Sequence, residues 1–227
     1  MEILVGLIRN GKYSYKREHD KYWNDKDFVE KALSVNGFYI MYVSDELKKD
    51  KEITMLAVKT NGSSLKYALK KFCNDKDIII RALKSNSHSF IFASNELKND
   101  KNFILECLEY DTYFLKFIPE NLKNDKDLFS KALKYNPNSL CFASEKIRDD
   151  KNLVLYAIRN GSFSLSDASI SLCDDKDIVL CALRKNKSNF KYMSNRLRKN
   201  RQLKKFYDPD CVFCIKIYTF IDIIRHF

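Results

Sequence analysis

The feature that constrains this chain most is a repeat with a strict period of 25 residues. An aspartate recurs at this interval, a lysine follows each one, and Asn200-Arg201 continues the register without an insertion. A period of this length is typical of stacked supersecondary units that bury their apolar faces only against neighbouring copies. The repeated aspartates are Asp25, Asp50, Asp75, Asp100, Asp125, Asp150 and Asp175.

Each repeat begins with a pattern that predicts an amphipathic helix. Apolar residues stand three, four and eight positions after the aspartate, and a small residue, usually Ala, stands at the seventh. These spacings place all four side chains on one helix face. The aspartate is a preferred N-cap. We expect the helix to stop at pairs such as Asn36-Gly37 and Asn136-Pro137, which tolerate left-handed geometry or cannot continue a helix.

A second, shorter helix is expected after a tight turn, with serine as its N-cap and a further serine closing it.

The N-terminus belongs to the array, because residues 3–11 align without gaps to residues 153–161. The predicted fold is all-α, a solenoid-like stack of about eight 25-residue helical hairpins over residues 1–205, followed by an apolar C-terminal capping helix over residues 206–227. The repeats open near residues 1, 25, 50, 75, 100, 125, 150 and 175. The candidate caps of the second helix are Ser63, Ser64, Ser89, Ser139 and Ser164.

Composition agrees with a folded helical chain. The 227 residues are 45% hydrophobic, while 5 Gly and 3 Pro are too few for the turns of an all-β sandwich. The N-terminus lacks the basic start of a signal peptide. The apolar run from Cys211 to Ile224 is interrupted by Lys216 and Asp222, and it is shorter than the roughly 20 residues that span a bilayer. We expect no membrane segment and a cytoplasmic location.

The cysteines and histidines give no pattern of a metal or catalytic site. Seven Cys, an odd number, argue against a secreted disulfide framework. Cys211 and Cys214 form the only close pair of cysteines in the sequence, and His226 is the one histidine that follows them. A structural zinc site requires four ligands, so this set is incomplete. We therefore expect no metal and no cofactor, and we interpret the cysteines as apolar helix positions.

Nothing in the repeat predicts an enzyme. One aspartate per repeat at every helix start is what N-capping requires, and the lysine ladder beside it is interpreted as a solvated helix start whose charge the adjacent aspartate cancels. The three histidines occupy unrelated repeat positions, with no Cys or Asp at a catalytic spacing to them. Nucleotide-binding and zinc-protease motifs are absent from the sequence.

The positive charge is concentrated at one end. Ten Lys and Arg residues and no Asp or Glu lie between positions 184 and 205, which nearly equals the net charge of +11 of the whole chain. Such a segment attracts polyanions and steers charged partners, although a solubilising end cap is the alternative. The predicted partner-binding residues are Arg184, Lys185, Lys187, Lys191, Tyr192, Arg196, Arg198, Lys199, Arg201, Lys204 and Lys205.

A weaker cluster near the N-terminus mixes cations with aromatic rings. If they are exposed, these rings can stack on bases or anchor a protein interface; the packing of the first repeat explains some of them equally well. The secondary partner-binding residues are Lys12, Tyr13, Tyr15, Lys16, Arg17, Tyr22 and Trp23.

The repeated motifs are Asn-Asp-Lys-Asp, Ala-Leu-Lys and Ser-Leu-x-Phe-Ala-Ser. From Asn24 to Leu203 the chain with these motifs resembles a helical repeat family, the domain of unknown function four-one-one-six. Proteins with these repeats occur in bacteria, in intracellular pathogens and in viral or mobile-element genes, and the family has no known catalytic motif. The resemblance implies an interaction module. The unit from Asp100 departs most from the pattern, with Asp111 in place of the turn Asn and Pro119 in place of Ser.

Three functions follow as expectations. The first is a non-enzymatic scaffold that binds a protein or ribonucleoprotein through the basic C-terminal repeat; in a viral or mobile gene, as the resemblance implies, it would inhibit a host defence complex such as a CRISPR-like nuclease by occlusion. The second is direct nonspecific binding of RNA or DNA by the same residues. The third is a structural or oligomerising protein that uses the apolar tail from Val212 to Ile224.

Overall fold

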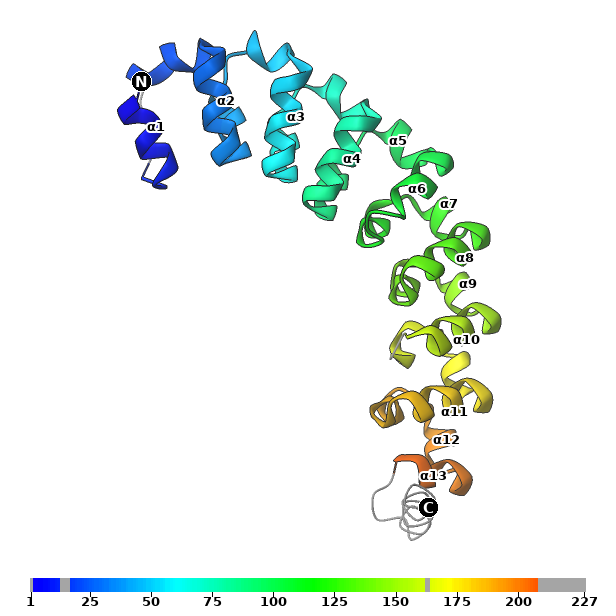
Figure 1. Cartoon of the computed structure of the whole chain (residues 1–227). Helices are drawn as coiled ribbons and strands as arrows, with labels where there is room; N and C mark the ends of the chain where they lie inside the picture. The colour runs from blue at the N-terminus through cyan, green and yellow to red at the C-terminus, as the bar shows by residue number, and fades with distance from the viewer. Residues whose placement is uncertain (1, 13–16, 162–163, 208–227) are drawn as a thin grey trace, which may run out of the picture. The chain divides into compact units, whose positions relative to one another are not determined.

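The computed structural model describes residues 2–12, 17–161 and 164–207 (Figure 1). Over these ranges the regular structure is helical throughout and contains no strand, as the sequence predicts. The chain divides into two compact units, Met1–Leu122 and Lys123–Phe227, and each is described by itself. None of the described helices is long and apolar enough to cross a membrane. The predicted apolar cap lies outside the described residues from position 208 onward.

The first helix of each repeat begins at the residue after the aspartate, as predicted. Asp75 shows how the cap works: its carboxylate accepts hydrogen bonds from the backbone N–H groups of Asp77 and Ile78, at 3.1 and 3.2 Å. These N–H groups have no partner inside the helix, so the cap stabilises its first turn. The first helices are α2 (Lys26–Val35), α3 (Lys51–Thr60), α4 (Lys76–Ser85), α6 (Lys101–Cys107), α8 (Lys126–Tyr135), α10 (Lys151–Asn160) and α11 (Lys176–Lys185), with α1 (Glu2–Arg9) and α13 (Arg201–Tyr207) at the ends.

These helices end at the predicted residues, but mostly by another mechanism. Asn36, Asn86 and Asn136 have φ values of −150°, −161° and −147°, which is extended backbone. Left-handed geometry was therefore the wrong expectation for Asn36 and Asn86, and among the described non-glycine residues no φ is positive. At Asn136 the following Pro137 disfavours continuing the helix, as expected. Gly161, with φ of 122°, ends α10 in the way that was expected of a glycine.

The second segment of each repeat is a 3-10 helix, and asparagine rather than serine caps most of these helices. With its backbone extended, Asn86 can turn its side-chain oxygen onto the N–H of His88, at 2.9 Å. Ser89 does not act as the cap, because its hydroxyl donates to the carbonyl of Asn86. Ser164 alone among the predicted serines is the N-cap of its segment. The second segments are η2 (Gly37–Tyr42), η4 (Gly62–Tyr67), η6 (Ser87–Phe92), η7 (Tyr113–Phe117), η8 (Pro137–Phe142), η9 (Leu165–Asp167) and η11 (Lys187–Lys191).

A short third segment makes each repeat more than a two-helix hairpin. The serine that was expected to close the second helix instead caps this third segment: Ser94 is the N-cap of α5 (Asn95–Asn99), and Ser194 is the N-cap of α12 (Asn195–Arg198). Their backbone N–H groups donate to the carbonyls of Cys73 and Cys173 in the preceding repeat, at 2.7 and 3.0 Å. The third segments are η1 (Arg17–Asn24), η3 (Leu47–Lys49), η5 (Lys70–Asn74), α5 (Asn95–Asn99), α7 (Glu120–Lys123), α9 (Glu145–Arg148), η10 (Leu172–Asp174) and α12 (Asn195–Arg198).

Neighbouring repeats pack closely within a unit. In the first unit α2, α3 and α4 lie side by side, and η2, η4 and η6 follow the same order (Figure 1). A Cβ atom on Gly37 would lie 2.0 Å from the carbonyl oxygen of Ala57, and one on Gly62 would lie 2.2 Å from that of Ala82. The small residues at the seventh repeat position are fully buried at these crossings. Stability thus comes from stacking one repeat on the next.

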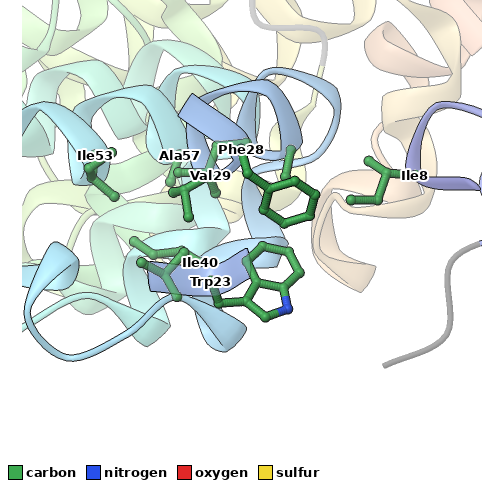
Figure 2. Close-up of a cluster of buried hydrophobic side chains, with 10 residues drawn as sticks. Ile8, Trp23, Phe28, Val29, Ile40, Ile53 and Ala57 are labelled. Carbon is green, nitrogen blue, oxygen red and sulfur yellow. The ribbon is translucent and has the colours of Figure 1, made fainter. Parts of the chain in front are cut away.

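Two aromatic residues near the N-terminus, Tyr22 and Trp23, pack in or against the core. Trp23 is buried, and its ring meets that of Phe28 edge-on, with the centroids 5.1 Å apart (Figure 2). Ile8 of α1 and Ile40 of η2 belong to the same cluster (Figure 2). The first repeat therefore shares its core with the second, and Trp23 serves packing rather than an exposed contact.

A ladder of ion pairs runs along the helix starts. In five repeats the Lys after the aspartate reaches the aspartate of the next repeat, so the lysine charge is compensated across repeats and not by the adjacent aspartate, as had been expected. The side-chain N···O distances are 2.7 to 2.8 Å for four pairs. The pairs are Lys26–Asp50, Lys51–Asp75 and Lys76–Asp100 in the first unit, and Lys126–Asp150 and Lys151–Asp175 in the second.

The ladder predicts a stability term that depends on pH. Hydrogen bonds from Lys26 and Lys76 hold the pKa values of Asp50 and Asp100 below the usual carboxyl value. A lowered pKa stabilises the folded chain at neutral pH, and that contribution is lost as the pH falls through the folded-state pKa. We expect the double variant Lys26→Met/Lys76→Met to unfold at lower urea than the wild type at pH 7, with the difference vanishing toward about pH 2. Lys70→Met, at an exposed lysine outside the ladder, is the control. A difference that stayed constant with pH would contradict this account.

Candidate macromolecule-binding surface

The basic end, residues 184–205, is assembled from the last turn of α11 with η11, α12 and α13. Asn189, Met193, Leu197 and Leu203 are buried and hold these segments together. The side chains between them point outward: nine of the ten cations are exposed, and Lys205 is half-buried. The structure therefore gathers the predicted residues on the surface of one repeat and its neighbour.

At this end the ladder no longer contributes acidic residues. In the last repeat Asn200 stands in place of the aspartate and Gln202 in place of the following acidic residue. Lys176, the last ladder lysine, consequently donates to the amide oxygen of Gln202, at 2.7 Å, instead of pairing with a carboxylate. The positive charge of the basic end accumulates where the acids of the ladder stop.

Arg196 is one predicted cation with an acidic partner. Its Nε lies 2.9 and 3.1 Å from the two carboxylate oxygens of Asp174, and its Nη2 donates to the carbonyl of Asp174 at 2.8 Å. Hydrogen bonds from Ser194 and then from Arg196 lower the pKa of Asp174. Arg196 thus joins two repeats, and its charge is largely compensated.

The aromatic rings of the basic end face one another or its cations. Phe190 and Tyr207 stack with their centroids 5.5 Å apart and 10° between their planes. Phe206 has Arg184 and Lys205 at 5.8 and 5.3 Å from its ring centroid. Tyr192 is 40% exposed, with Lys191 at 5.2 Å. Each of these rings therefore has at least one contact within the chain, while Phe190 stays 43% exposed.

A groove of about 740 Å³ lies between α10 and α11 of the second unit. Arg159 and Arg184 line it from the same repeat position on the two helices, and Leu155 and Leu180 line it between them. Sequence reasoning found Arg184 but missed the other three, because they lie outside the acid-free segment. The 25-residue register could have identified them, because residues 25 apart on stacked first helices lie on the same face.

The secondary cluster is only partly described. Lys12 is exposed, Tyr22 is half-buried against Phe28 at 5.6 Å, and Trp23 is buried. The structure thus does not bring these residues together as one exposed surface. Tyr13, Tyr15 and Lys16, as well as the side chain of Arg17, lie outside the described residues.

The described cysteines are free thiols. Burial raises the pKa of Cys107 to about 12, which keeps its thiol protonated and unreactive. Within residues 2–12, 17–161 and 164–207, no three His, Cys, Asp or Glu side chains are grouped as metal ligands. The pair Cys211 and Cys214 falls outside those ranges, as does His226.

Comparison with known proteins identifies the repeat. A family model described as "Domain of unknown function (DUF4116)" matches residues 7–48, 25–73, 50–98, 100–148 and 150–198. The matches follow the register of the aspartates and extend over most of the chain. No curated protein and no solved structure matches the chain significantly.

Proposed function

We propose, from the premise that this chain belongs to the DUF4116 family, that it is a non-enzymatic interaction protein whose basic end binds an acidic surface of a protein or ribonucleoprotein. The repeats are proposed to form a solenoid-like stack, which the packing of first helix on first helix within each unit supports. Such a stack presents side chains from successive repeats on one continuous face.

The observation that carries the proposal is the exposed, acid-free basic end. Between residues 184 and 205 the chain has ten cations and no acid, and one carboxylate that reaches in from outside, Asp174, is held by Arg196. Desolvating so many cations is unfavourable unless a partner supplies negative charge, so the partner is expected to be acidic. Cations presented in this way also speed association by steering.

A protein face is favoured over direct nucleic-acid binding because of the rings. Single-stranded nucleic acid gains about 1–3 kcal/mol per base by stacking on aromatic side chains. At the basic end, Phe190 and Tyr207 stack on each other, and Phe206 contacts two cations. Inhibition of a host defence complex by occlusion and assembly through the tail at residues 212–224 stay predictions from the sequence.

The test is charge reversal at two exposed cations, Arg198→Glu/Lys199→Glu, which leaves the Arg196–Asp174 pair in place. Immobilised full-length chain would be used to capture partners from a lysate of the organism that carries the gene, with and without nuclease. We expect a protein partner that survives nuclease treatment and whose capture falls at least ~10-fold in the variant.

The matched control is Lys66→Glu/Lys116→Glu, with the same change in net charge at exposed lysines on the 3-10 helices of the first unit. Its capture should equal that of the wild type. Equal capture by the Arg198→Glu/Lys199→Glu variant would remove the basic end from the proposal. Capture that disappeared with nuclease, and with moderate salt, would instead indicate direct nucleic-acid binding.

A further inference from the structure

We propose that the groove between α10 and α11 is a docking site for an acidic peptide segment that carries aliphatic side chains. This inference rests on the proposed function, since it names the part of an acidic protein partner that would be recognised. It adds a second contact surface, centred on Arg159, beside the basic end.

The cations of the groove come from three repeat positions. Arg159 and Arg184 occupy the ninth position after the aspartates of their repeats, Lys185 the tenth, and Lys151 the first. Lys151 is held by two carboxylates, at 2.7 Å from Asp175 and 3.1 Å from Asp177. Among the described residues that line the groove, the one acid, Asp177, is therefore already paired.

The remaining charge calls for an anionic occupant. Arg159 and Lys185 are exposed. Arg184 is exposed as well, and its guanidinium lies 5.8 Å from the centroid of the Phe206 ring. A guanidinium presents its N–H groups as a planar fork that matches a carboxylate or phosphate with two hydrogen bonds. Two such forks on adjacent helices would engage two carboxylates of one chain.

The surface between the cations selects a peptide over a nucleic acid. Leu155, Leu180 and Cys181 are half-buried and line the groove, and no aromatic residue is among the described residues that line it. Aliphatic side chains of a peptide gain free energy when they are buried on such a surface. Bases gain most from aromatic platforms, which these described lining residues do not supply.

The corresponding position in the first unit shows that the repeat alone does not create this site. Between α3 and α4, Lys59 and Lys84 occupy the positions of Arg159 and Arg184. The ammonium of Lys84 lies 4.1 Å from the ring centroid of Tyr110, toward the following repeat, and Ser85 replaces the second cation of α11. The paired guanidinium groups belong to α10 and α11.

The experiment measures fluorescence anisotropy of a labelled peptide of alternating Glu and Leu residues, titrated with the full chain. Arg159→Glu is expected to weaken binding at least ~10-fold, because it replaces an attractive pair with a repulsive one. Leu180→Asn should weaken binding of the peptide by about 3-fold or more, because the apolar contact is lost. The matched control Lys59→Glu/Lys84→Glu, at the same repeat positions in the first unit, should bind as the wild type does. Circular dichroism checks that each variant is folded.

The outcomes separate this inference from the proposed function. If Arg159→Glu binds the peptide as tightly as the wild type does, or if the peptide does not bind at all, the groove is not a peptide-docking site. The proposed function, tested by capture through Arg198 and Lys199, would be unaffected by either result. Equal losses in the Arg159→Glu variant and the matched control also overturn the docking site, since they show a general charge effect. A labelled oligouridylate could also bind more tightly than the peptide, with neither probe affected by Leu180→Asn. That result would assign the groove to nucleic acid and contradict its assignment to a peptide.

Discussion

Replacing Phe103 with alanine is expected to lower the free energy of unfolding by about 3–5 kcal/mol. The Phe103 side chain is fully buried, and its ring lies 6.4 Å from that of Phe90, with 21° between the planes. Phe90 in turn lies 4.7 Å from Phe114. Removing the central contact of α6 leaves a void between two repeats that cannot collapse without moving their helices.

Urea unfolding followed by circular dichroism measures this loss. Tyr135→Ala is the control, because that ring is 58% exposed and its removal should change the free energy of unfolding by no more than about 0.5 kcal/mol. A loss of less than about 1 kcal/mol for Phe103→Ala would show that the repeats relax around the cavity, and it would contradict the close packing described for this unit.

The same region shows how far the sequence determines the fold. Asp111 and Pro119 mark the unit from Asp100 as irregular, and the aspartate register correctly predicts where α6 begins. The sequence pattern does not reveal that Phe114 takes the place of a buried serine, Ser89 or Ser139, and packs on the preceding repeat. That contact joins residues of different repeats, so it depends on how closely the repeats stack.

The second segments were harder to predict for a related reason. Asparagine and serine stand within three residues of one another at several turns, as at Asn86 and Ser89, and both are good caps. Only the extended backbone at Asn86 decides that its side chain, and not that of Ser89, reaches the free N–H. A 3-10 helix differs from an α-helix by one residue in its hydrogen bonds, a choice that packing against neighbouring repeats settles.

The candidate site was predicted in part, again for physical reasons. Local composition locates the basic end, because charge adds up along a short segment whatever the fold. It does not show that Arg196 is paired with Asp174 or that Arg159 lies across a groove from Arg184, since these neighbours are 22 and 25 residues apart in sequence. The repeat register relates Arg159 to Arg184, because they occupy equivalent positions, but it does not relate Arg196 to Asp174.

A second large effect is expected at Asn189, a buried amide that joins two repeats. Its side-chain oxygen accepts the backbone N–H of Leu165 at 2.8 Å, and its Nδ2 donates to the carbonyls of Ala182 and Asn186, both at 3.1 Å. Serine occupies this position in several other repeats, so the amide is particular to the basic end. Asn189→Asp would replace the donating Nδ2 with a buried carboxylate oxygen that faces the carbonyls of Ala182 and Asn186.

We expect Asn189→Asp to lower the free energy of unfolding by about 3–5 kcal/mol at pH 7. Burial and the facing carbonyls raise the pKa of the introduced carboxyl above its unfolded value of about 3.9. The folded variant then binds a proton that the unfolded chain releases, so the deficit relative to wild type shrinks as the pH falls toward about 4. Protonation restores one donor toward the carbonyls of Ala182 and Asn186.

Urea titrations of wild type and variant between pH 7 and 4 measure this difference. Asn138→Asp, with the same change in charge at an exposed asparagine, is the control and should show a small, nearly constant difference. A deficit for Asn189→Asp that did not shrink on acidification would mean that the position is hydrated or that the segment has opened. In that case Asn189 could not hold η11 against the preceding repeat, and the cations of the basic end would lack the fixed spacing on which the proposed recognition depends.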